Sequence, residues 1–152
     1  MASTFQKLNL KDQGTILVVS APPSFEPELA KLRNVDVARA VGDLSDVQFS
    51  LAFVTKQHEV DNLARAIANK AKGDAILWFA YPKGTSRKYT SEINRDRGWQ
   101  TLGALGFEPV RAVAIDEDWS ALRFRRAEFI KTLSRDRAHA ISASGKARAG
   151  KE

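Results

Sequence analysis

Only three residues, Asp116 to Asp118, separate the last two strands that the sequence predicts, over 110–115 and 119–125. A parallel crossover needs about a dozen residues or more, so these two strands must form an antiparallel hairpin. Upstream of the hairpin, the apolar run over 75–81 is typical of a strand that is buried on both faces of a parallel sheet. The chain must therefore combine a parallel sheet with a reversed pair of strands.

The other predicted elements alternate between strand and helix. β-branched or alternating apolar residues predict strands over 15–20, 35–41 and 47–54. Apolar residues at helical spacing predict a short helix over 25–33, a longer one over 60–71, and a third that Asn94 caps and Gly106 ends. This alternation predicts one α/β domain over 1–129, a three-layer α/β/α sandwich. With strands numbered along the chain, the mostly parallel sheet should run in the order 2-1-3-4-6-5, with strand 6 antiparallel.

The composition narrows the chemistry that such a domain could carry. The sequence has no cysteine and two histidines, which excludes disulfides and cysteine-ligated metals, and no metal site is predicted. No apolar run approaches the ~20 residues of a membrane helix, and the first residues do not resemble a signal peptide. We therefore expect a cytoplasmic protein without a membrane partner.

The net charge of +6 is concentrated near the C-terminus. Residues 130–152 hold six basic and two acidic side chains, a net +4, whereas residues 1–129 hold 18 and 16, a net +2. We expect this basic tail to be partly helical and then disordered. A charged end of this kind is usually solvated, and binding of nucleic acid or of another protein through the tail is an alternative function.

A basic loop follows the apolar strand over 75–81. In open α/β sheets, ligands bind outside the carboxyl ends of the strands, where this loop would lie. Cations, hydroxyl groups and a glycine for close approach are what an anion or phosphate site requires. The candidate ligand-binding residues are Lys83, Gly84, Thr85, Ser86, Arg87, Arg95 and Arg123. The alternative is a solvated loop whose charges keep the protein in solution.

Four further residues are candidates for supporting that site. They are Asp96, Asp116, Asp118 and Trp119. Arg95 would lie in the first turn of a helix, where the helix dipole disfavours a cation, so it should have an acidic partner or a bound anion. Asp116 and Asp118 could supply that partner in a structural network. Trp119 shares a strand face with Arg123, which indicates either a stacking platform or arginine stems that cover the ring.

The predicted fold resembles that of class I S-adenosylmethionine-dependent methyltransferases, whose sheet also ends in a reversed hairpin. The resemblance implies a glycine-rich turn after the first strand, where the backbone approaches the cofactor. Here that turn, Ser20 to Pro27, has no glycine, and Pro22 and Pro23 remove backbone donors. Asp43 is a weak candidate for an acid that binds the cofactor ribose. No cofactor is therefore predicted, and S-adenosylmethionine is disfavoured.

The second half of the chain holds a distinctive set of motifs. They are Tyr81-Pro-Lys-Gly84, Asn94-Arg-Asp96, Gly98-Trp99 and Val113-Ala-Ile-Asp-x-x-Trp-Ser-Ala-Leu-Arg-Phe-Arg125. This set resembles a family of small bacterial proteins of unknown function, over about residues 8–126. The resemblance implies no activity.

From these observations we expect a bacterial α/β domain that is non-enzymatic or binds a small anionic or phosphorylated ligand at the strand carboxyl ends. An alternative is a divergent enzyme of the methyltransferase fold, with a remodelled cofactor pocket bordered by Asp43 and the Pro22-Pro23 turn. The fold does not decide between them, because one fold hosts many functions.

Overall fold

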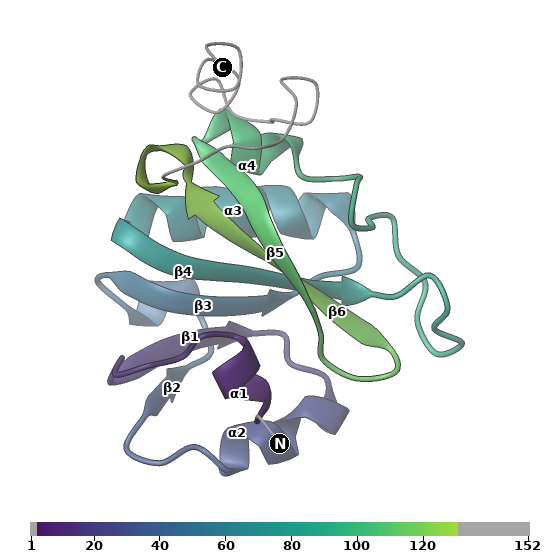
Figure 1. Cartoon of the computed structure of the whole chain (residues 1–152), viewed down its shortest axis with the longest axis horizontal. Helices are drawn as coiled ribbons and strands as arrows, with labels where there is room; N and C mark the ends of the chain where they lie inside the picture. Colours follow the sequence, from purple (N-terminus) through teal and green to yellow (C-terminus); the bar gives the residue numbers. More distant parts are fainter. Residues whose placement is uncertain (1–2, 131–152) are drawn as a thin grey trace.

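The computed structural model describes residues 3–130 of the chain. Six strands form one sheet in the order β2-β1-β3-β4-β6-β5, which confirms the predicted order (Figure 1). β1 (Thr15–Val19), β2 (Asp36–Ala38), β3 (Val47–Phe53) and β4 (Ala71–Pro82) are parallel. β6 (Trp119–Arg126) lies antiparallel between β4 and β5 (Phe107–Ala114). The prediction of a basic tail that is partly helical falls on residues outside the described range.

Helices cover both faces of the sheet, which confirms the three-layer sandwich (Figure 1). α3 (Gln57–Lys70) and α4 (Gln100–Ala104) lie on one face, and α1 (Thr4–Lys7) and α2 (Glu26–Ala30) on the other. Three short 3-10 turns are η1 (Pro23–Phe25), η2 (Val41–Asp43) and η3 (Ala127–Phe129). None of the helices in residues 3–130 is long and apolar enough to cross a membrane.

β4 supplies both halves of the core. All eight residues from Ala75 to Pro82 are buried, because successive side chains of a strand point to opposite faces and helices cover both. Leu77, Phe79 and Tyr81 pack on the side of α3 and α4. Ile76, Trp78 and Ala80 pack on the side of α1 and α2. The apolar run is continuous because neither face of this strand meets water.

α1, which seals the second core, was not predicted from the sequence. The Ser3 hydroxyl accepts a hydrogen bond from the Gln6 amide, and the Gln6 side chain accepts one from the Ser3 amide. This reciprocal cap fixes a single helical turn. The turn buries Phe5 and brings the Leu8 carbonyl to the indole Nε1 of Trp78, at 2.8 Å. A Ser-x-x-Gln spacing was the available signal.

The helix predicted to start at Asn94 is much shorter than expected. The Asn94 side chain accepts a hydrogen bond from the Asp96 amide, and Asn94 and Arg97 pair as an isolated β-bridge. Asparagine offers the backbone this alternative to a helix. Gly98 then has φ of 105°, which a helix does not allow. α4 therefore begins only at Gln100.

Three strands also differ from their predicted bounds by more than one residue at an end. β2 is shorter than 35–41. β4 begins at Ala71, four residues earlier than predicted, and its ladder with β3 shifts register around Gly73, whose φ is 58°. β5 begins at Phe107 and contains Pro109, which a strand tolerates because β5 lies at the edge of the sheet.

Candidate functional site

The carboxyl ends of β1, β3 and β4 meet at one edge of the sheet, on the right of Figure 1. β6 begins at the same edge, because Trp119 lies opposite Pro82. There the Lys83 amide donates to the Asp118 carbonyl at 2.8 Å. The loop after β4 and the turn between β5 and β6 therefore lie side by side.

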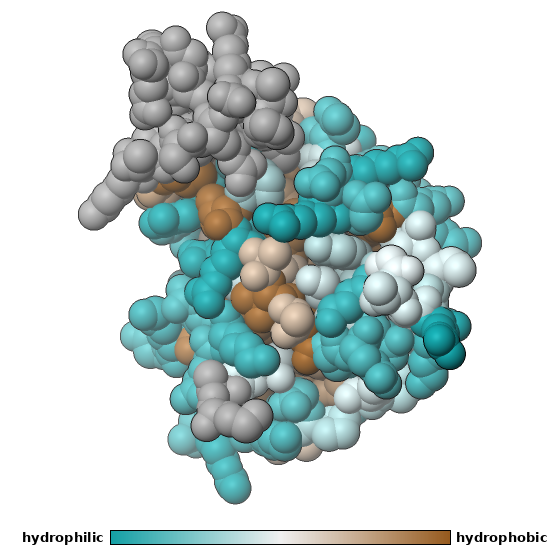
Figure 2. All heavy atoms as spheres, turned by 45° about the vertical axis from the view of Figure 1, so that its right-hand side comes forward, coloured by the Kyte–Doolittle hydropathy of each residue, from teal (hydrophilic) through white to brown (hydrophobic). Residues whose placement is uncertain are grey.

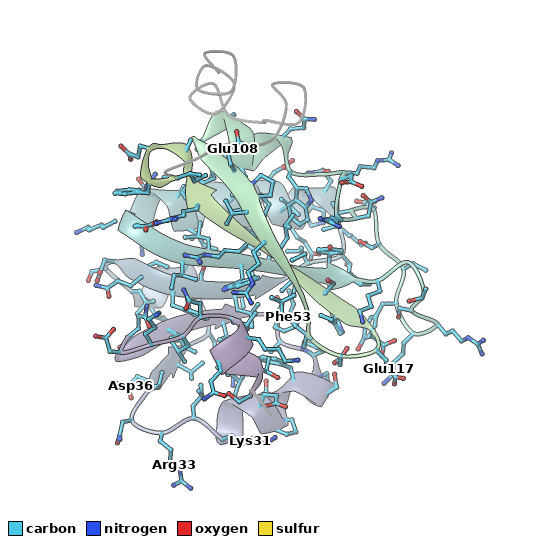
Figure 3. All side chains as sticks on the ribbon, viewed as in Figure 1. Lys31, Arg33, Asp36, Phe53, Glu108 and Glu117 are labelled. Carbon is cyan, nitrogen blue, oxygen red and sulfur yellow. The ribbon has the colours of Figure 1, made fainter. Side chains whose placement is uncertain are left out.

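A hollow of about 470 Å³ opens between this loop and this turn. It is lined by Thr85, Arg87, Lys88, Glu117 and Asp118. The volume is within the range of small-molecule sites. Two cations and two carboxylates line it, so their charges cancel, and the hollow lacks the excess positive charge that a small anion needs. Figure 3 shows Glu117 at the tip of the β5–β6 turn, pointing outward.

Ser86 holds the wall of the hollow together. Its hydroxyl donates to Asp118 Oδ1 at 2.8 Å and accepts from the amides of Lys88 and Tyr89, both at 3.2 Å. Asp116 acts within the turn, where its Oδ1 accepts from the amides of Asp118 and Trp119. Among the predicted site residues, the structure thus brings Thr85, Ser86, Arg87 and Asp118 together, with Lys83 at the start of the loop.

Gly84 and Asp43 have no feature that places them at a ligand. Gly84 is exposed, and a Cβ atom built on it would meet only open space. Asp43 ends η2, and the carbonyls of Val41, which begins η2, and of Leu44, which follows it, accept from Lys70 Nζ at 2.9 and 2.6 Å. Because Lys70 directly precedes β4, this contact puts η2 near the amino-terminal edge of the sheet, away from the turn after β1.

Four aromatic rings link the turn after β1 to the loop after β4. Ring centroids are separated by 5.0 Å between Phe25 and Phe53, 5.1 Å between Phe53 and Trp119, and 4.9 Å between Trp119 and Tyr89. Phe53 lies inside the molecule beside this edge (Figure 3). Trp119 is 4% exposed, and its Nε1 has no hydrogen-bond partner among the described residues. Trp119 is thus covered by other aromatic rings, and the predicted arginine cover is not its packing partner.

β1 and β3 are neighbours, but the chain leaves them toward opposite faces, so the switch point of the sheet lies between them. The residue that follows β1 is Ser20, which is exposed and has φ of 59°. Pro22 is buried and Pro23 begins η1. A left-handed residue makes the sharp turn that a glycine would otherwise make.

The start of α3 is fixed at the same edge. Glu59 accepts hydrogen bonds from the amides of Thr55 and Lys56, at 2.9 and 3.0 Å. Partial burial raises the pKa of this carboxyl, but the hydrogen bonds from Thr55 and Lys56 outweigh it and lower the pKa below its ordinary value. The Glu92 amide in turn donates to the Thr55 carbonyl at 2.9 Å, so the loop after β4 closes over the end of β3.

Arg95 and Asp96 lie on the other side of the sheet from Trp119. The Trp99 indole donates to the Asn94 and Arg95 carbonyls, and its ring packs on Phe79 and Phe124. Arg95 is exposed and forms no ion pair within residues 3–130. The expected network between Arg95 and the carboxylates of the β5–β6 turn is absent there, because Asp116 and Asp118 are engaged locally.

Arg123 lies in the middle of β6, opposite Trp78, and is therefore remote from the loop. Its partner in β5 is Arg111, which is not among the predicted site residues. The signal was available: counting back in pairs from the short turn over 116–118 places Arg111 opposite Arg123. No group of three or more His, Cys, Asp or Glu residues in the described part of the chain could hold a metal ion.

The chain matches no protein-family model, and no curated protein is similar to it in sequence. A solved S-adenosylmethionine-dependent methyltransferase from Aquifex aeolicus is similar in structure, with a TM-score of 0.58 and 16% identity over 80% of this chain and 87% of that chain. The fibrillarin pre-rRNA processing protein of Methanococcus jannaschii is similar with a TM-score of 0.49 and 14% identity, over 83% of this chain and 69% of that chain. N-methyltransferase NodS from Bradyrhizobium japonicum is similar with a TM-score of 0.47 and 14% identity, over 81% of this chain and 93% of that chain. The likeness to the Aquifex aeolicus protein, together with the order of the sheet, shows that the chain has a methyltransferase-like α/β fold.

The likeness corrects two expectations from the sequence. A non-enzymatic or small-anion-binding protein was the wrong main interpretation, because the solved structure that shares this fold is an S-adenosylmethionine-dependent methyltransferase. The expectation that S-adenosylmethionine is disfavoured is wrong for the same reason. It relied on the missing glycines, whereas Ser20 adopts the left-handed backbone without one. The similarity to a small bacterial family, which no family model tests, stays a prediction.

Proposed function

We propose that this chain is a divergent enzyme of the methyltransferase fold that binds S-adenosylmethionine outside the carboxyl ends of β1 and β3. The observation that carries the proposal is the backbone of Ser20, with φ of 59° at the switch point of the sheet. Ligands of open α/β sheets bind at that point. Non-glycine residues at positive φ are uncommon and gather at ligand clamps and active sites.

The residues at the turn after β1 fit such a cofactor, but with contacts that differ from those of a glycine-rich turn. Pro22 and Pro23 have no N–H, so the donors that a glycine-rich turn supplies are fewer here. The Ser20 hydroxyl is exposed and bonds to no group in residues 3–130, so it is free to contact a ligand. Phe25 and Phe53 provide an apolar floor beneath the turn. When bound, the cofactor would supply an electrophilic methyl group on a sulfonium.

The hollow beside the loop after β4 is the place that we assign to the methyl acceptor. It lies at the same sheet edge as Ser20, and the aromatic row from Phe25 to Tyr89 connects the two. Hydrophilic side chains flank apolar ones on this side of the molecule, as Figure 2 shows. Thr85 and Glu117 offer the acceptor a hydroxyl and a carboxylate, while Arg87 and Lys88 offer cations.

Isothermal titration calorimetry with S-adenosylmethionine and S-adenosylhomocysteine tests the cofactor site. The wild-type chain should release or absorb heat on binding both. Ser20→Lys puts bulk and a positive charge beside a cationic sulfonium, so it should weaken binding of S-adenosylmethionine at least ~10-fold, or ~1.4 kcal/mol. Thr15→Lys, which is exposed at the opposite end of β1, adds the same charge and should leave binding unchanged. Absence of heat for both ligands at millimolar concentration would refute the proposal.

A further inference from the structure

Two arginines oppose each other on the sheet face that carries Trp78. Arg111 of β5 and Arg123 of β6 are direct Cα partners in the antiparallel ladder. Side chains at directly opposed positions point to the same face with Cβ atoms about 5 Å apart, and like charges there destabilise the pair. Arg111 is exposed and Arg123 is half-buried. Because the two positive charges repel each other in this register, a negative charge nearby would stabilise the pair.

Within residues 3–130, no acceptor satisfies Arg123. Its Nε atom is buried and has no hydrogen-bond partner. Both oxygens of Asp74 are taken by Arg125, at distances from 2.6 to 3.1 Å. Glu108 is buried and stands opposite Arg125 in the ladder, not opposite Arg123. The guanidinium of Arg123 therefore has donors to offer and receives no acceptor from these carboxylates.

The electrostatics agree with this geometry. Burial lowers the pKa of Arg123, the charges of Arg125 and Arg111 lower it further, and Asp74 opposes them only in part. A half-buried charge without a hydrogen-bonded partner costs stability. An acceptor from a bound molecule would remove that cost. Guanidinium groups match phosphate oxygens in a bidentate geometry, more closely than a lysine does.

We propose that this face of β5 and β6 binds the phosphodiester backbone of a single-stranded nucleic acid through Arg111 and Arg123. The proposal names a substrate class for the proposed enzyme. Only the statement that this nucleic acid accepts the methyl group rests on the proposed function. Binding of the nucleic acid does not, because it is measured without a cofactor.

The surroundings of the arginine pair favour a polyanion over a small anion. α1 and α2 lie against the lower strands in Figure 1, and the core beneath them takes in only Val113, Trp119 and Ala121 from this face of β5 and β6. Farther along the same face, Arg111 is exposed and Arg123 is half-buried. Residues 131–152 hold six basic and two acidic side chains and so add a net charge of +4 to the chain, which also favours a polyanion as ligand.

Two exposed apolar side chains favour a single strand over a duplex. Val110 and Phe129 are the large hydrophobic residues that remain exposed in the described chain. Val110 precedes Arg111 at the irregularity of the β5–β6 ladder, and Phe129 lies in η3 after the end of β6, so both belong to the same part of the chain as the arginines. Bases of a single strand are free to pack on such side chains, and base–aromatic stacking is tolerant of sequence. A duplex would hide its bases from them.

Fluorescence anisotropy of a labelled 20-nucleotide RNA of mixed sequence tests the inference with the full chain at 50 mM salt. The double variant Arg111→Gln/Arg123→Gln should bind at least ~10-fold more weakly than wild type. The matched control is Lys31→Gln/Arg33→Gln, which removes the same charge from the far end of the molecule (Figure 3). It should change the dissociation constant by less than about twofold.

The salt dependence identifies phosphate contacts directly. The logarithm of the binding constant falls with the logarithm of salt concentration, with a slope of about −0.7 per neutralised phosphate of a single strand. Loss of both arginines should therefore reduce the magnitude of the slope by ~1.4, and Arg111→Gln alone by ~0.7. Circular dichroism shows whether the double variant folds. If it does not, Arg111→Gln alone still tests the inference, because Arg111 is exposed and its replacement should leave the fold intact.

Three results would overturn the inference. They are no binding of the RNA or of the matching DNA strand by wild type, an equal loss in both double variants, and competition by polyglutamate as strong as by RNA. The last would indicate an acidic protein partner. Because these assays contain no cofactor, failure of S-adenosylmethionine to bind would not alter them, and the two proposals fail independently.

Discussion

Ser20 shows how one residue can carry strain at a candidate site. Its φ of 59° costs a residue with a Cβ atom about 1–2 kcal/mol. Ser20→Gly removes that cost but adds entropy to the unfolded chain, so we expect unfolding free energy to rise by ~1 kcal/mol. The melting temperature, followed by circular dichroism, should then rise by about 3 °C. Ser24→Gly, in η1 without a positive φ, should lower it, and a fall for both would contradict the prediction.

Single residues were also where sequence reasoning was weakest. The left-handed backbone of Ser20 could not be predicted from the sequence, because serine has no marked preference for the left-handed region of φ and ψ. Arg123 was chosen for its shared strand face with Trp119, yet the two act separately: Trp119 packs among aromatic rings and Arg123 faces Arg111. The alternation of residues along a strand predicts which face of the sheet a side chain lies on. To predict its neighbours on the adjacent strands, the register of the ladder must also be known.

At the scale of elements, the start of α3 depends on the ionised carboxylate of Glu59. Its pKa is lowered in the folded chain, so the stabilisation is present above the unfolded value of about 4.3 and is lost as pH falls through the folded value. Glu59→Gln should therefore lower unfolding free energy by ~1 kcal/mol at pH 7, the usual loss of a helix cap. The difference from wild type should shrink as pH falls below about 4.

Urea unfolding at pH 7, 4 and 3 measures that difference. The matched control is Glu117→Gln, because this exposed side chain forms no hydrogen bond or ion pair within residues 3–130. It should differ little from wild type at any of the three pH values. A deficit for Glu59→Gln that stays constant from pH 7 to 3 would mean that the carboxylate charge is not what stabilises α3.

Long periodic elements were predicted well and short ones poorly. α3 and the apolar part of β4 have patterns that only one structure satisfies. The segment after Asn94 fits both a helix and a turn locally, and tertiary contacts decide. Trp99 is drawn into the core beside Tyr81, and the Asn94 side chain closes the turn that permits it.

At the scale of the whole molecule, α1 closes the second core from the far end of the chain. Phe5 is buried, with ring centroids 5.7 Å from Phe25 and 6.2 Å from Phe49. Phe5→Ala should lower the unfolding free energy by ~3 kcal/mol, because truncation of a buried aromatic ring leaves a cavity. Urea unfolding measures the loss, and the exposed neighbour Gln6→Ala should cost ~1 kcal/mol through its cap alone. Equal losses would show that Phe5 adds nothing beyond the cap.

The topology of the whole chain could be predicted because few arrangements satisfy its rules. Alternating elements require parallel crossovers, and a link of three residues at 116–118 permits only a hairpin. The function could not be predicted in the same way. The missing glycines at the turn after β1 argued against a cofactor, but a glycine motif is only one way to make a sharp turn, and Ser20 makes this one with a left-handed backbone.

No linker separates α3 from β4: Lys70 ends the helix and Ala71 begins the strand. The first residues of the strand are nevertheless irregular: Lys72, Gly73 and Asp74 are exposed, Gly73 has φ of 58°, and the register of the β3–β4 ladder shifts there. The helix and the buried run from Ala75 to Pro82 are therefore joined through a short bulged stretch. A displacement of the helix would be taken up first in this stretch, before it reached the ladder that β4 shares with β3 and β6.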